Sequence, residues 1–261
     1  MAYSPFNLSG KVALVTGGNG GIGLGSADAL AQAGADICIW GRNDEKNQAA
    51  VEQLKQHGTK VHAIVCDVAD ESAVETSFAE TLSVMGKVDT CFANAGVGGG
   101  RRSPFHERTS EQWHRVTSVN LDGLFYTLRA AAKHMVERSQ QGDPGGRLIA
   151  TSSLAAIMGM ARAEHYAATK GAVISMMQAL AIEYARHGIT AHSILPGHIH
   201  TGMTDATYQN EKFVDAVMPR IPMRRWGKPE DFGGIAVYLA SDASAYHTAE
   251  TFLIDGGFFM F

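Results

Sequence analysis

Residues 11–23 read Lys-Val-Ala-Leu-Val-Thr-Gly-Gly-Asn-Gly-Gly-Ile-Gly, a short apolar run that ends in a cluster of glycines. The apolar run predicts a buried strand, and the pattern from Ser26 to Ala33 predicts a helix after it. Glycines between a strand and a helix let backbone N–H groups approach a pyrophosphate. We therefore expect Gly17 to make the tight turn, Gly21 to approach the phosphates and Gly23 to let the helix pack closely. A flexible glycine loop without a ligand is the alternative.

The same alternation of strand-like and helical segments continues along the chain. It predicts a doubly wound α/β fold, with helices on both faces of one mainly parallel sheet, in a single domain over residues 1–261. Residues 201–225 look irregular or loosely helical, and long excursions of this kind are usually lids or binding loops, so we expect a substrate loop over about 198–225. The predicted strands are 11–16, 36–40, 61–65, 88–92, 147–151, 189–195 and 251–255.

Composition excludes several classes of function. The chain has 261 residues, 45% of them hydrophobic, and a formal net charge of -4 without a basic run, which argues against nucleic-acid binding. No apolar run approaches the roughly 20 residues of a membrane helix, and residues 1–6 do not resemble a signal peptide. The odd set of cysteines, Cys38, Cys66 and Cys91, predicts reduced, buried thiols in a cytoplasmic protein.

The end of the second predicted strand indicates which dinucleotide would bind. A carboxylate here would hold the ribose 2′-hydroxyl of NAD, but the residues are Gly41 and Arg42. A guanidinium suits a 2′-phosphate, which it can hold with two hydrogen bonds, so we favour NADP(H). Asp44 and Glu45 keep NAD(H) open. The alternative for this segment is a helix cap, with Asn43 or Asp44 as N-cap and Arg42 in water.

Tyr166 and Lys170 form a candidate acid/base pair. They are four residues apart at the start of a long apolar-periodic segment, which places both on one helix face. A lysine beside the phenol would lower its pKa toward neutrality. Ser153 follows the strand at 147–151 and could meet Tyr166 at one carbonyl, although it could equally be a turn residue. Asn120 interrupts an apolar helix face, where it serves either as a structural clasp or in a water relay.

Other strand ends carry further candidate residues. Asp67 and Val68 follow the third strand, where an adenine could lie. The turn Asn94-Ala95-Gly96 follows the fourth strand and brings a small backbone to the same sheet edge as the glycines. Residues 98–102, three glycines and two arginines, predict a mobile surface loop with solvated arginines.

In their order along the chain, these motifs resemble the short-chain dehydrogenase/reductase family. The likeness covers nearly the whole sequence, and Ser153 precedes Tyr166 by thirteen residues as in that family. The motifs that carry it are Thr16-Gly17 to Gly23, Asn94-Ala95-Gly96, Asn120, Ser153, Tyr166 to Lys170 and Pro196-Gly197.

The resemblance implies a Rossmann-like sheet of seven strands, a nicotinamide cofactor and hydride transfer between an alcohol and a carbonyl. Tyr166 is then the general acid/base, while Lys170 lowers its pKa and holds the nicotinamide ribose. Ser153 polarises the carbonyl and Asn120 supports a relay water. The implied cofactor-binding set adds Asn19, Ile22, Asn43, Pro196, Gly197, Ile199 and Thr201, the last two facing the nicotinamide amide. The resemblance also implies a homotetramer, or a homodimer, whose subunits cover the apolar tail at residues 258–261. In one departure, Thr248-Ala249 stands where Thr-Gly is frequent.

These expectations combine into carbonyl reduction with NADPH. The apolar residues Ile157, Met158, Met160, Met203, Tyr208 and Phe213 predict a roomy pocket for a small apolar ketone or alcohol. An NAD-dependent alcohol dehydrogenase and a 3-oxoacyl thioester reductase are the alternatives on this fold. A non-redox lyase or epimerase and a silent nucleotide-binding regulator are the rival classes. We expect no metal, because His198 and His200 have no third ligand at a helpful spacing.

Overall fold

The computed structural model describes residues 4–100 and 103–261. Its sheet has seven parallel strands in the order β3-β2-β1-β4-β5-β6-β7, which confirms the predicted fold class. The expectations for Met1–Tyr3 and for solvated Arg101 and Arg102 fall outside the described residues. The strands are β1 (Val12–Thr16), β2 (Asp36–Gly41), β3 (Val61–Val65), β4 (Thr90–Ala93), β5 (Gly146–Thr151), β6 (Ile189–Pro196) and β7 (Thr251–Ile254).

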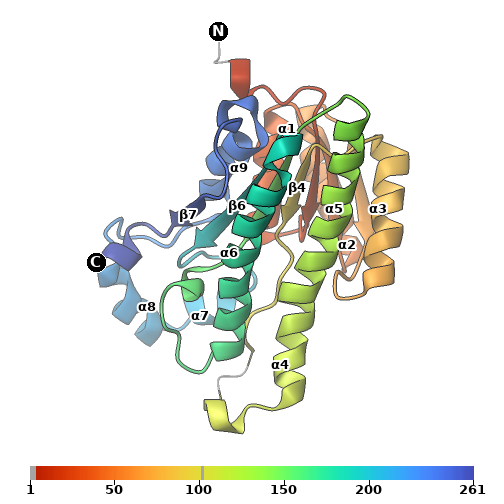
Figure 1. Ribbon diagram of the computed structural model, residues 1–261. Coiled ribbons are helices and arrows are strands. Elements are labelled where there is room, and N and C mark those ends of the chain that lie inside the picture. Colours follow the sequence, from red (N-terminus) through yellow and green to blue (C-terminus); the bar gives the residue numbers. More distant parts are fainter. Residues whose placement is uncertain (1–3, 101–102) are drawn as a thin grey trace.

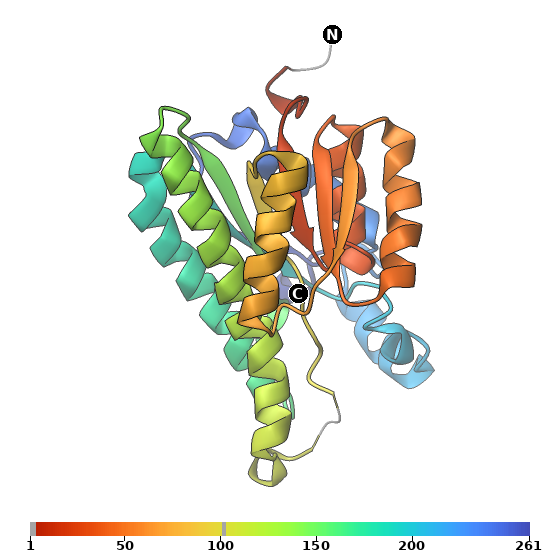
Figure 2. The same cartoon turned by 90° about the vertical axis from the view of Figure 1, so that its right-hand side faces the viewer.

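Helices cover both faces of this sheet (Figures 1 and 2). One apolar cluster joins the sheet to α3, α5 and α6, and a second joins its other face to α1, α2 and α9. Strand β1 is buried along its whole length, as its unbroken apolar sequence predicts for a strand covered on both sides. These helices are α1 (Gly21–Gln32), α2 (Asp44–Leu54), α3 (Glu71–Met85), α5 (Gly123–Gln140), α6 (Glu164–Tyr184) and α9 (Gly233–Ala240).

The strand order reverses between β1 and β4, the two central neighbours. The chain passes from β1 to β2 on one side of this central pair and from β4 to β5 on the other. The loops that follow β1 and β4 therefore diverge at the carboxyl ends of the strands. Open parallel sheets bind ligands in the crevice that such a reversal creates. The fold therefore places the glycine turn after β1 opposite the Asn94 turn after β4.

The helical segment that contains Asn120 is divided in two. Helix α4 (Ser110–Thr117) leads through a π-helical turn, Ser118–Asp122, into α5. The buried Asn120 lies within that turn, and π-turns often occur at functional sites. Helix α4 extends beyond the carboxyl ends of the strands, at the bottom of Figure 1.

The segment after β6 is partly helical, which is one of the two forms that its sequence pattern predicts. It contains α7 (Asp205–Tyr208) and α8 (Glu211–Val217), which lie beyond the sheet edge in Figure 1. Apolar residues of α8 join Leu154, Trp226 and Phe258 in a third, smaller cluster. This cluster covers only the first residue of the apolar tail. Phe258 is buried in it, whereas Met260 and Phe261 stay 84% and 73% exposed.

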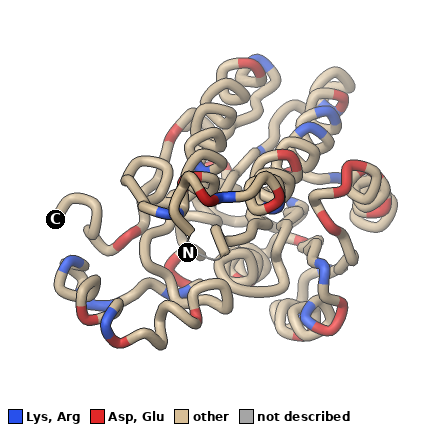
Figure 3. The backbone as a smooth tube through the Cα atoms, turned by 90° about the horizontal axis from the view of Figure 1, so that it is seen from below, with Lys and Arg blue, Asp and Glu red and all other residues tan. Residues whose placement is uncertain are grey.

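The distribution of charged residues and the burial of the cysteines are both typical of a folded α/β protein. Basic and acidic residues are interspersed along the backbone (Figure 3). In the part of the chain that the structure describes, no helix combines the length and apolar character needed to cross a bilayer. Cys38, Cys66 and Cys91 are all free and buried.

Ala249 adopts the left-handed backbone conformation, with φ of 65°. This conformation costs a residue with a Cβ roughly 1–2 kcal/mol, and glycine avoids the penalty. The departure from Thr-Gly at this position therefore leaves local strain before β7.

His192, in the middle of β6, is a fully buried histidine. Neither ring nitrogen has a hydrogen-bond partner of good geometry among the described residues. Burial, opposed only in part by the nearby backbone of His247, lowers the pKa of this imidazole to about 4. The folded protein therefore holds His192 neutral at a pH where the unfolded chain would protonate it.

We expect this histidine to make the protein sensitive to acid. Because the folded pKa lies below the unfolded value, its stability contribution is complete above the unfolded pKa and is lost as pH falls toward 4. Between pH 7 and pH 5 the loss is about 2 kcal/mol, at about 1.4 kcal/mol per pKa unit. Urea unfolding at both pH values checks this: His192→Leu should reduce the difference, and the exposed His106→Gln should not. An unchanged difference in His192→Leu contradicts the assignment.

Candidate active site

A cavity of about 580 Å³ lies at the carboxyl ends of β1, β4, β5 and β6. The glycine turn forms one side of it, with left-handed backbone at Gly17 (φ 64°) and Gly21 (φ 53°). Gly23 does not line the cavity. A Cβ on Gly23 would lie 2.3 Å from the Gly17 carbonyl oxygen, so this glycine permits the close approach of α1 to the turn. Of the expected cofactor residues, the cavity is lined by Gly17, Asn19, Gly21, Ile22, Arg42, Asn94, Ala95, Gly96, Tyr166, Lys170, Pro196, Gly197, Ile199 and Thr201.

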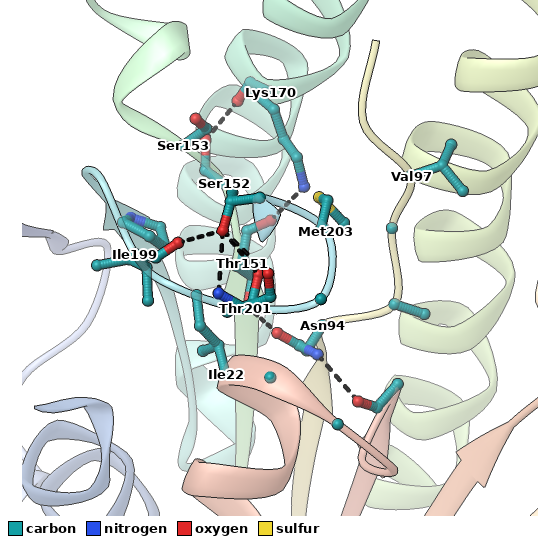
Figure 4. Close-up of a pocket in the computed structure, with 18 of the residues that line it drawn as sticks. Ile22, Asn94, Val97, Thr151, Ser152, Ser153, Lys170, Ile199, Thr201 and Met203 are labelled. Atoms are coloured by element: carbon teal, nitrogen blue, oxygen red, sulfur yellow. Dashed lines mark hydrogen bonds between the residues drawn. The ribbon is translucent and has the colours of Figure 1, made fainter. Parts of the chain in front are cut away.

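Asn94 ties three strand ends together. Its side-chain nitrogen donates to the Thr16 carbonyl at 3.2 Å, and its side-chain oxygen accepts from the Thr151 hydroxyl at 3.0 Å (Figure 4). The Thr16 hydroxyl accepts in turn from the backbone N–H groups of Asn94 and Ala95, both at 3.0 Å. These bonds fix the two sides of the crevice relative to each other.

At one end of the cavity, Arg42 and Lys46 are exposed cations on its wall. The Arg42 guanidinium lies 3.7 Å from the Asp67 carboxylate. A Cβ at position 41 would lie 2.1 Å from the side-chain nitrogen of Asn19, so no acidic side chain fits where NAD-binding folds use one. Asp44 and Glu45 lie in the first turn of α2 and do not line the cavity.

Besides Gly23, three expected cofactor residues lie outside the cavity wall. Asn43 is the N-cap of α2, and its side chain accepts from the backbone N–H of Lys46 at 2.8 Å, which is the capping alternative. Asp67 turns its carboxylate to the N–H of Ala69 at 3.1 Å and to Arg42. Val68 is buried against Gly123. Each of these three residues contacts its neighbours in the fold instead of lining the cavity.

Tyr166 and Ser153 face each other at the inner end of the cavity. Tyr166 is in the first turn of α6, and Ser153 begins the short helical turn after β5. The Ser153 hydroxyl oxygen accepts from the Ala155 N–H at 3.1 Å, which leaves its proton free to donate elsewhere. Burial raises the pKa of the Tyr166 phenol, and a hydrogen bond with Ser153 opposes that rise.

Lys170 shares the expected helix face with Tyr166 but contacts the chain differently. Its ammonium donates to the Thr151 carbonyl at 2.7 Å and lies 5.8 Å from the centroid of the Tyr166 ring. Burial lowers the pKa of Lys170 to about 8. Burial shifts the two pKa values in opposite directions, because desolvation disfavours the charged form of each group. The lowering of the Tyr166 pKa by Lys170 stays a prediction. In Figure 4, Lys170 and Ser152 flank the end of β5, and the Ser152 hydroxyl donates to the Lys170 carbonyl at 2.7 Å.

Asn120 acts as a clasp in this structure. Its side-chain oxygen accepts from the Val97 N–H at 2.8 Å, and its nitrogen donates to the Val97 carbonyl at 3.0 Å. A longer contact of 3.4 Å joins the same nitrogen to the Thr169 hydroxyl on α6. Asn120 therefore joins the loop after β4 to the helix that carries Tyr166.

The loop after β6 closes the cavity from the other side. Thr204 holds it in shape, since its hydroxyl donates to the Ile199 carbonyl at 2.6 Å and accepts from the Thr201 N–H at 2.9 Å. Gly197 packs closely on Asp255, where a Cβ would lie 2.5 Å from the Asp255 Cβ. This loop thereby brings Ile199 and Thr201 to the wall.

A second cavity of about 510 Å³ adjoins the first. The two cavities share Ser153, Tyr166, Gly197, Met203 and Thr204. Of the residues expected to form an apolar pocket, Met158, Met160, Met203 and Phe213 line it, whereas Ile157 and Tyr208 do not. Leu154 and Trp226 complete the apolar wall.

Gly98, Gly99 and Gly100 also line the second cavity, so the part of the expected surface loop that the structure describes forms one of its walls. The Arg115 guanidinium donates to the Gly98 carbonyl at 2.9 Å, and the ring of the buried His165 contacts the Gly99 carbonyl at 2.9 Å. Glycine-rich sequence gave no indication of these two side-chain partners from α4 and α6.

The two histidines considered as metal ligands have other contacts. His198 packs among aromatic rings, with its centroid 4.7 Å from that of Phe258 and 5.2 Å from that of Trp226. His200 stacks on Tyr208 at 3.9 Å and contacts the Asp205 carboxylate at 2.8 Å. Within residues 4–100 and 103–261, no group of three potential ligands could hold a metal ion.

Sequence reasoning missed several residues of the site. Lys46 lies one helical turn after Arg42, a spacing that could have indicated a second cation at the same place. Asn47 is fully buried and accepts from Asn19 at 2.6 Å, which fixes the side chain that lines the cavity. Thr204 gave no signal, because its role depends on the folded shape of its loop.

The chain is similar to known proteins over nearly its whole length. The family model described as enoyl-(acyl carrier protein) reductase matches residues 17–259. The gluconate 5-dehydrogenase of Gluconobacter oxydans (strain 621H) is 35% identical over 97% of this chain and 96% of its own.

Two solved structures have the same fold over nearly the whole chain. A short-chain type dehydrogenase/reductase from Mycobacterium marinum superimposes with a TM-score of 0.91 at 33% identity, covering 98% of each chain. A gluconate 5-dehydrogenase from Burkholderia cenocepacia J2315, in complex with NADP and tartrate, gives a TM-score of 0.91 at 34% identity, covering 99% of this chain and 100% of its own. The chain therefore belongs to the short-chain dehydrogenase/reductase family and is an NAD(P)-dependent oxidoreductase that acts on CH–OH groups.

Proposed function

We propose that this protein reduces a small ketone with NADPH, using Tyr166 as the proton donor and Ser153 as the donor to the carbonyl oxygen. One observation carries the proposal: these two residues border both cavities. The first cavity has the glycine turn and cations that suit a dinucleotide, and the second has walls that suit an organic substrate. A carbonyl held between them lies beside both hydroxyl groups.

The residues of the first cavity fit a nicotinamide dinucleotide. The positive φ at Gly17 and Gly21 opens the turn at the start of α1, where backbone N–H groups favour a pyrophosphate. Lys170 lies near Gly96 and Tyr166, and the loop bearing Ile199 and Thr201 approaches the glycine turn at Gly21. When bound, the nicotinamide supplies the hydride that reaches the carbonyl carbon.

Tyr166 and Ser153 manage the negative charge that develops on the carbonyl oxygen. Because burial raises its pKa, Tyr166 remains protonated at neutral pH and can give its proton to that oxygen. Ser153, oriented by its bond from Ala155, donates a hydrogen bond to the same atom. We assign Lys170 to the nicotinamide ribose and to charge support of the phenolate, and Asn120 to the clasp that positions α6, with a relay water as its further role.

We propose NADP(H) as the preferred cofactor, with NAD(H) as the alternative. Arg42 and Lys46 provide two cations for a 2′-phosphate, and the closed space at Gly41 leaves no place for a competing carboxylate. Asn43, Asp67 and Val68 would then act through the loop around the adenosine, since their side chains do not line the cavity.

Arg42→Ala should weaken NADPH selectively. A solvent-exposed charge-assisted contact to phosphate gives an expected rise in the NADPH Kd of about tenfold, against about twofold or less for NADH. Fluorescence titration of both cofactors measures the two values, and Lys55→Ala, at the far end of α2, is the matched control. An equal loss for both cofactors argues against the 2′-phosphate role.

For the substrate, we propose a small ketone or secondary alcohol whose largely apolar skeleton contacts Met158, Met203 and Trp226 in the second cavity. A panel of ketones and 3-oxoacyl thioesters, assayed with NADPH and NADH by the absorbance of reduced nicotinamide, tests this. The expected outcome is faster oxidation of NADPH with small ketones. Preference for the thioesters favours the acyl-thioester alternative, a product without net redox change favours a lyase or epimerase, and no turnover favours a regulator.

We further propose a single cytoplasmic domain that assembles as a homotetramer, with a homodimer as the alternative. The exposed apolar residues Phe125 and Ile182 on α5 and α6, and Met260 and Phe261 in the tail, support burial against other subunits. The three free, buried thiols suit a reducing compartment. Light scattering after size-exclusion chromatography measures the assembly, and a monomer contradicts it.

A further inference from the structure

We propose that the substrate carries a carboxylate, which the guanidinium groups of Arg115 and Arg162 bind at the outer part of the second cavity. This inference rests on the proposed function, because it concerns the same reacting centre at Ser153 and Tyr166. The observation behind it is the charge of the cavity wall. Among the described residues, Arg115 and Arg162 are its only permanently charged side chains, and no aspartate or glutamate lines it.

Glu164, the acidic residue closest in sequence to Arg162, does not neutralise the positive charge of the cavity wall. Glu164 accepts from the backbone N–H of Arg162 at 2.8 Å, and its other carboxylate oxygen lies 3.7 Å from the buried Arg108 guanidinium. Arg108 thereby compensates Glu164 outside the cavity. In the described parts of the chain, neither Arg115 nor Arg162 forms an ion pair, although the chain as a whole is acidic.

The backbone at Arg162 is held in an unfavourable conformation. Its φ is 64°, in the left-handed region that residues with a Cβ rarely adopt. Both of its backbone polar groups are fixed there, the N–H by Glu164 and the carbonyl by Arg108, which donates to it at 2.8 Å. Strain of this kind concentrates where a side chain must be aimed at a ligand, and here the side chain lines the cavity.

Arg115 is positioned by the glycine segment of the cavity wall. One of its terminal nitrogens donates to the Gly98 carbonyl at 2.9 Å, which fixes the guanidinium over the glycine segment and leaves its other N–H groups for a ligand. Two guanidinium groups are well suited to a planar carboxylate, which accepts paired hydrogen bonds.

These arginines do not belong to the cofactor site. Arg42 and Lys46 line only the first cavity, and Arg115 and Arg162 line only the second. The two histidines nearby add no charge at neutral pH, since burial lowers the pKa of both His165 and His198. The apolar wall thus faces the skeleton of the substrate, while the arginines face an anionic end.

The test compares oxo acids with their methyl esters, which differ in charge and little in shape. Levulinate, its homologue longer by one methylene, and both methyl esters are titrated calorimetrically into the complex with NADP⁺, which cannot reduce them. We expect at least one acid to bind about tenfold more tightly than its ester. Binding is read without turnover, so failure of the reductase proposal and failure of this one are separate results.

The variants Arg115→Gln and Arg162→Gln should each lower the acid-to-ester affinity ratio by about tenfold, and Arg162→Lys should retain part of it. Arg186→Gln, which removes a charge at the far end of α6, is the control and should keep the ratio. Raising NaCl from about 50 mM to about 500 mM should lower the acid's advantage. Equal binding of acid and ester, absence of binding by either acid, or ratios unchanged in both Gln variants overturns the proposal.

Discussion

Tyr166→Phe should abolish most of the turnover while leaving cofactor binding intact. The variant keeps the aromatic ring in the first turn of α6 and removes only the hydroxyl that borders both cavities. General acid catalysis typically contributes 10²–10⁴-fold, so we expect kcat to fall by about 10³-fold. The Kd of NADPH, measured by fluorescence titration, should change by about twofold or less, because the pyrophosphate and 2′-phosphate contacts lie elsewhere.

Tyr246→Phe is the matched control, since Tyr246 is fully exposed and lies outside both cavities. It loses the same hydroxyl and should retain normal turnover. Substantial activity in Tyr166→Phe would remove Tyr166 as the proton donor. A parallel loss of NADPH binding would instead indicate that the hydroxyl holds the cofactor.

The sequence alone was sufficient for the sheet and for the order of the site residues. The unbroken apolar run of β1 and the glycines after it have local signals, because a buried parallel strand and a positive-φ turn each restrict the residue types allowed. The spacing of Tyr166 and Lys170 is likewise a property of one helix. These predictions needed no knowledge of distant contacts.

The features that the sequence did not indicate concern residues whose partners are distant in sequence. Nothing within residues 98–100 indicates that Arg115 and His165 hold their carbonyls. The pKa of Tyr166 depends on burial and on where the Lys170 ammonium finds its acceptor, the Thr151 carbonyl on β5. Such features arise only when strands and helices are assembled, which is why the motif order was predictable and the electrostatics were not.

Gly23→Ala should damage both stability and cofactor binding, because the structure leaves no space for a methyl group. The added Cβ would lie 2.3 Å from the Gly17 carbonyl oxygen and 2.5 Å from the side-chain nitrogen of Asn94. The carbonyl belongs to the backbone, and Asn94 is held by Thr16 and Thr151, so neither can move without disturbing the turn.

We expect Gly23→Ala to destabilise the protein by about 2–3 kcal/mol, as overpacking does, despite alanine's better helix propensity. The melting temperature should fall by at least about 4 °C at a fixed protein concentration, and the NADPH Kd should rise more than about tenfold, because the phosphate-facing N–H groups are displaced. Gly234→Ala in α9, where an added Cβ meets nothing within 4 Å, is the control and should leave the melting temperature unchanged or slightly raised. A stable Gly23→Ala protein with normal NADPH affinity would mean that the close approach of α1 to the turn does not shape the cofactor site.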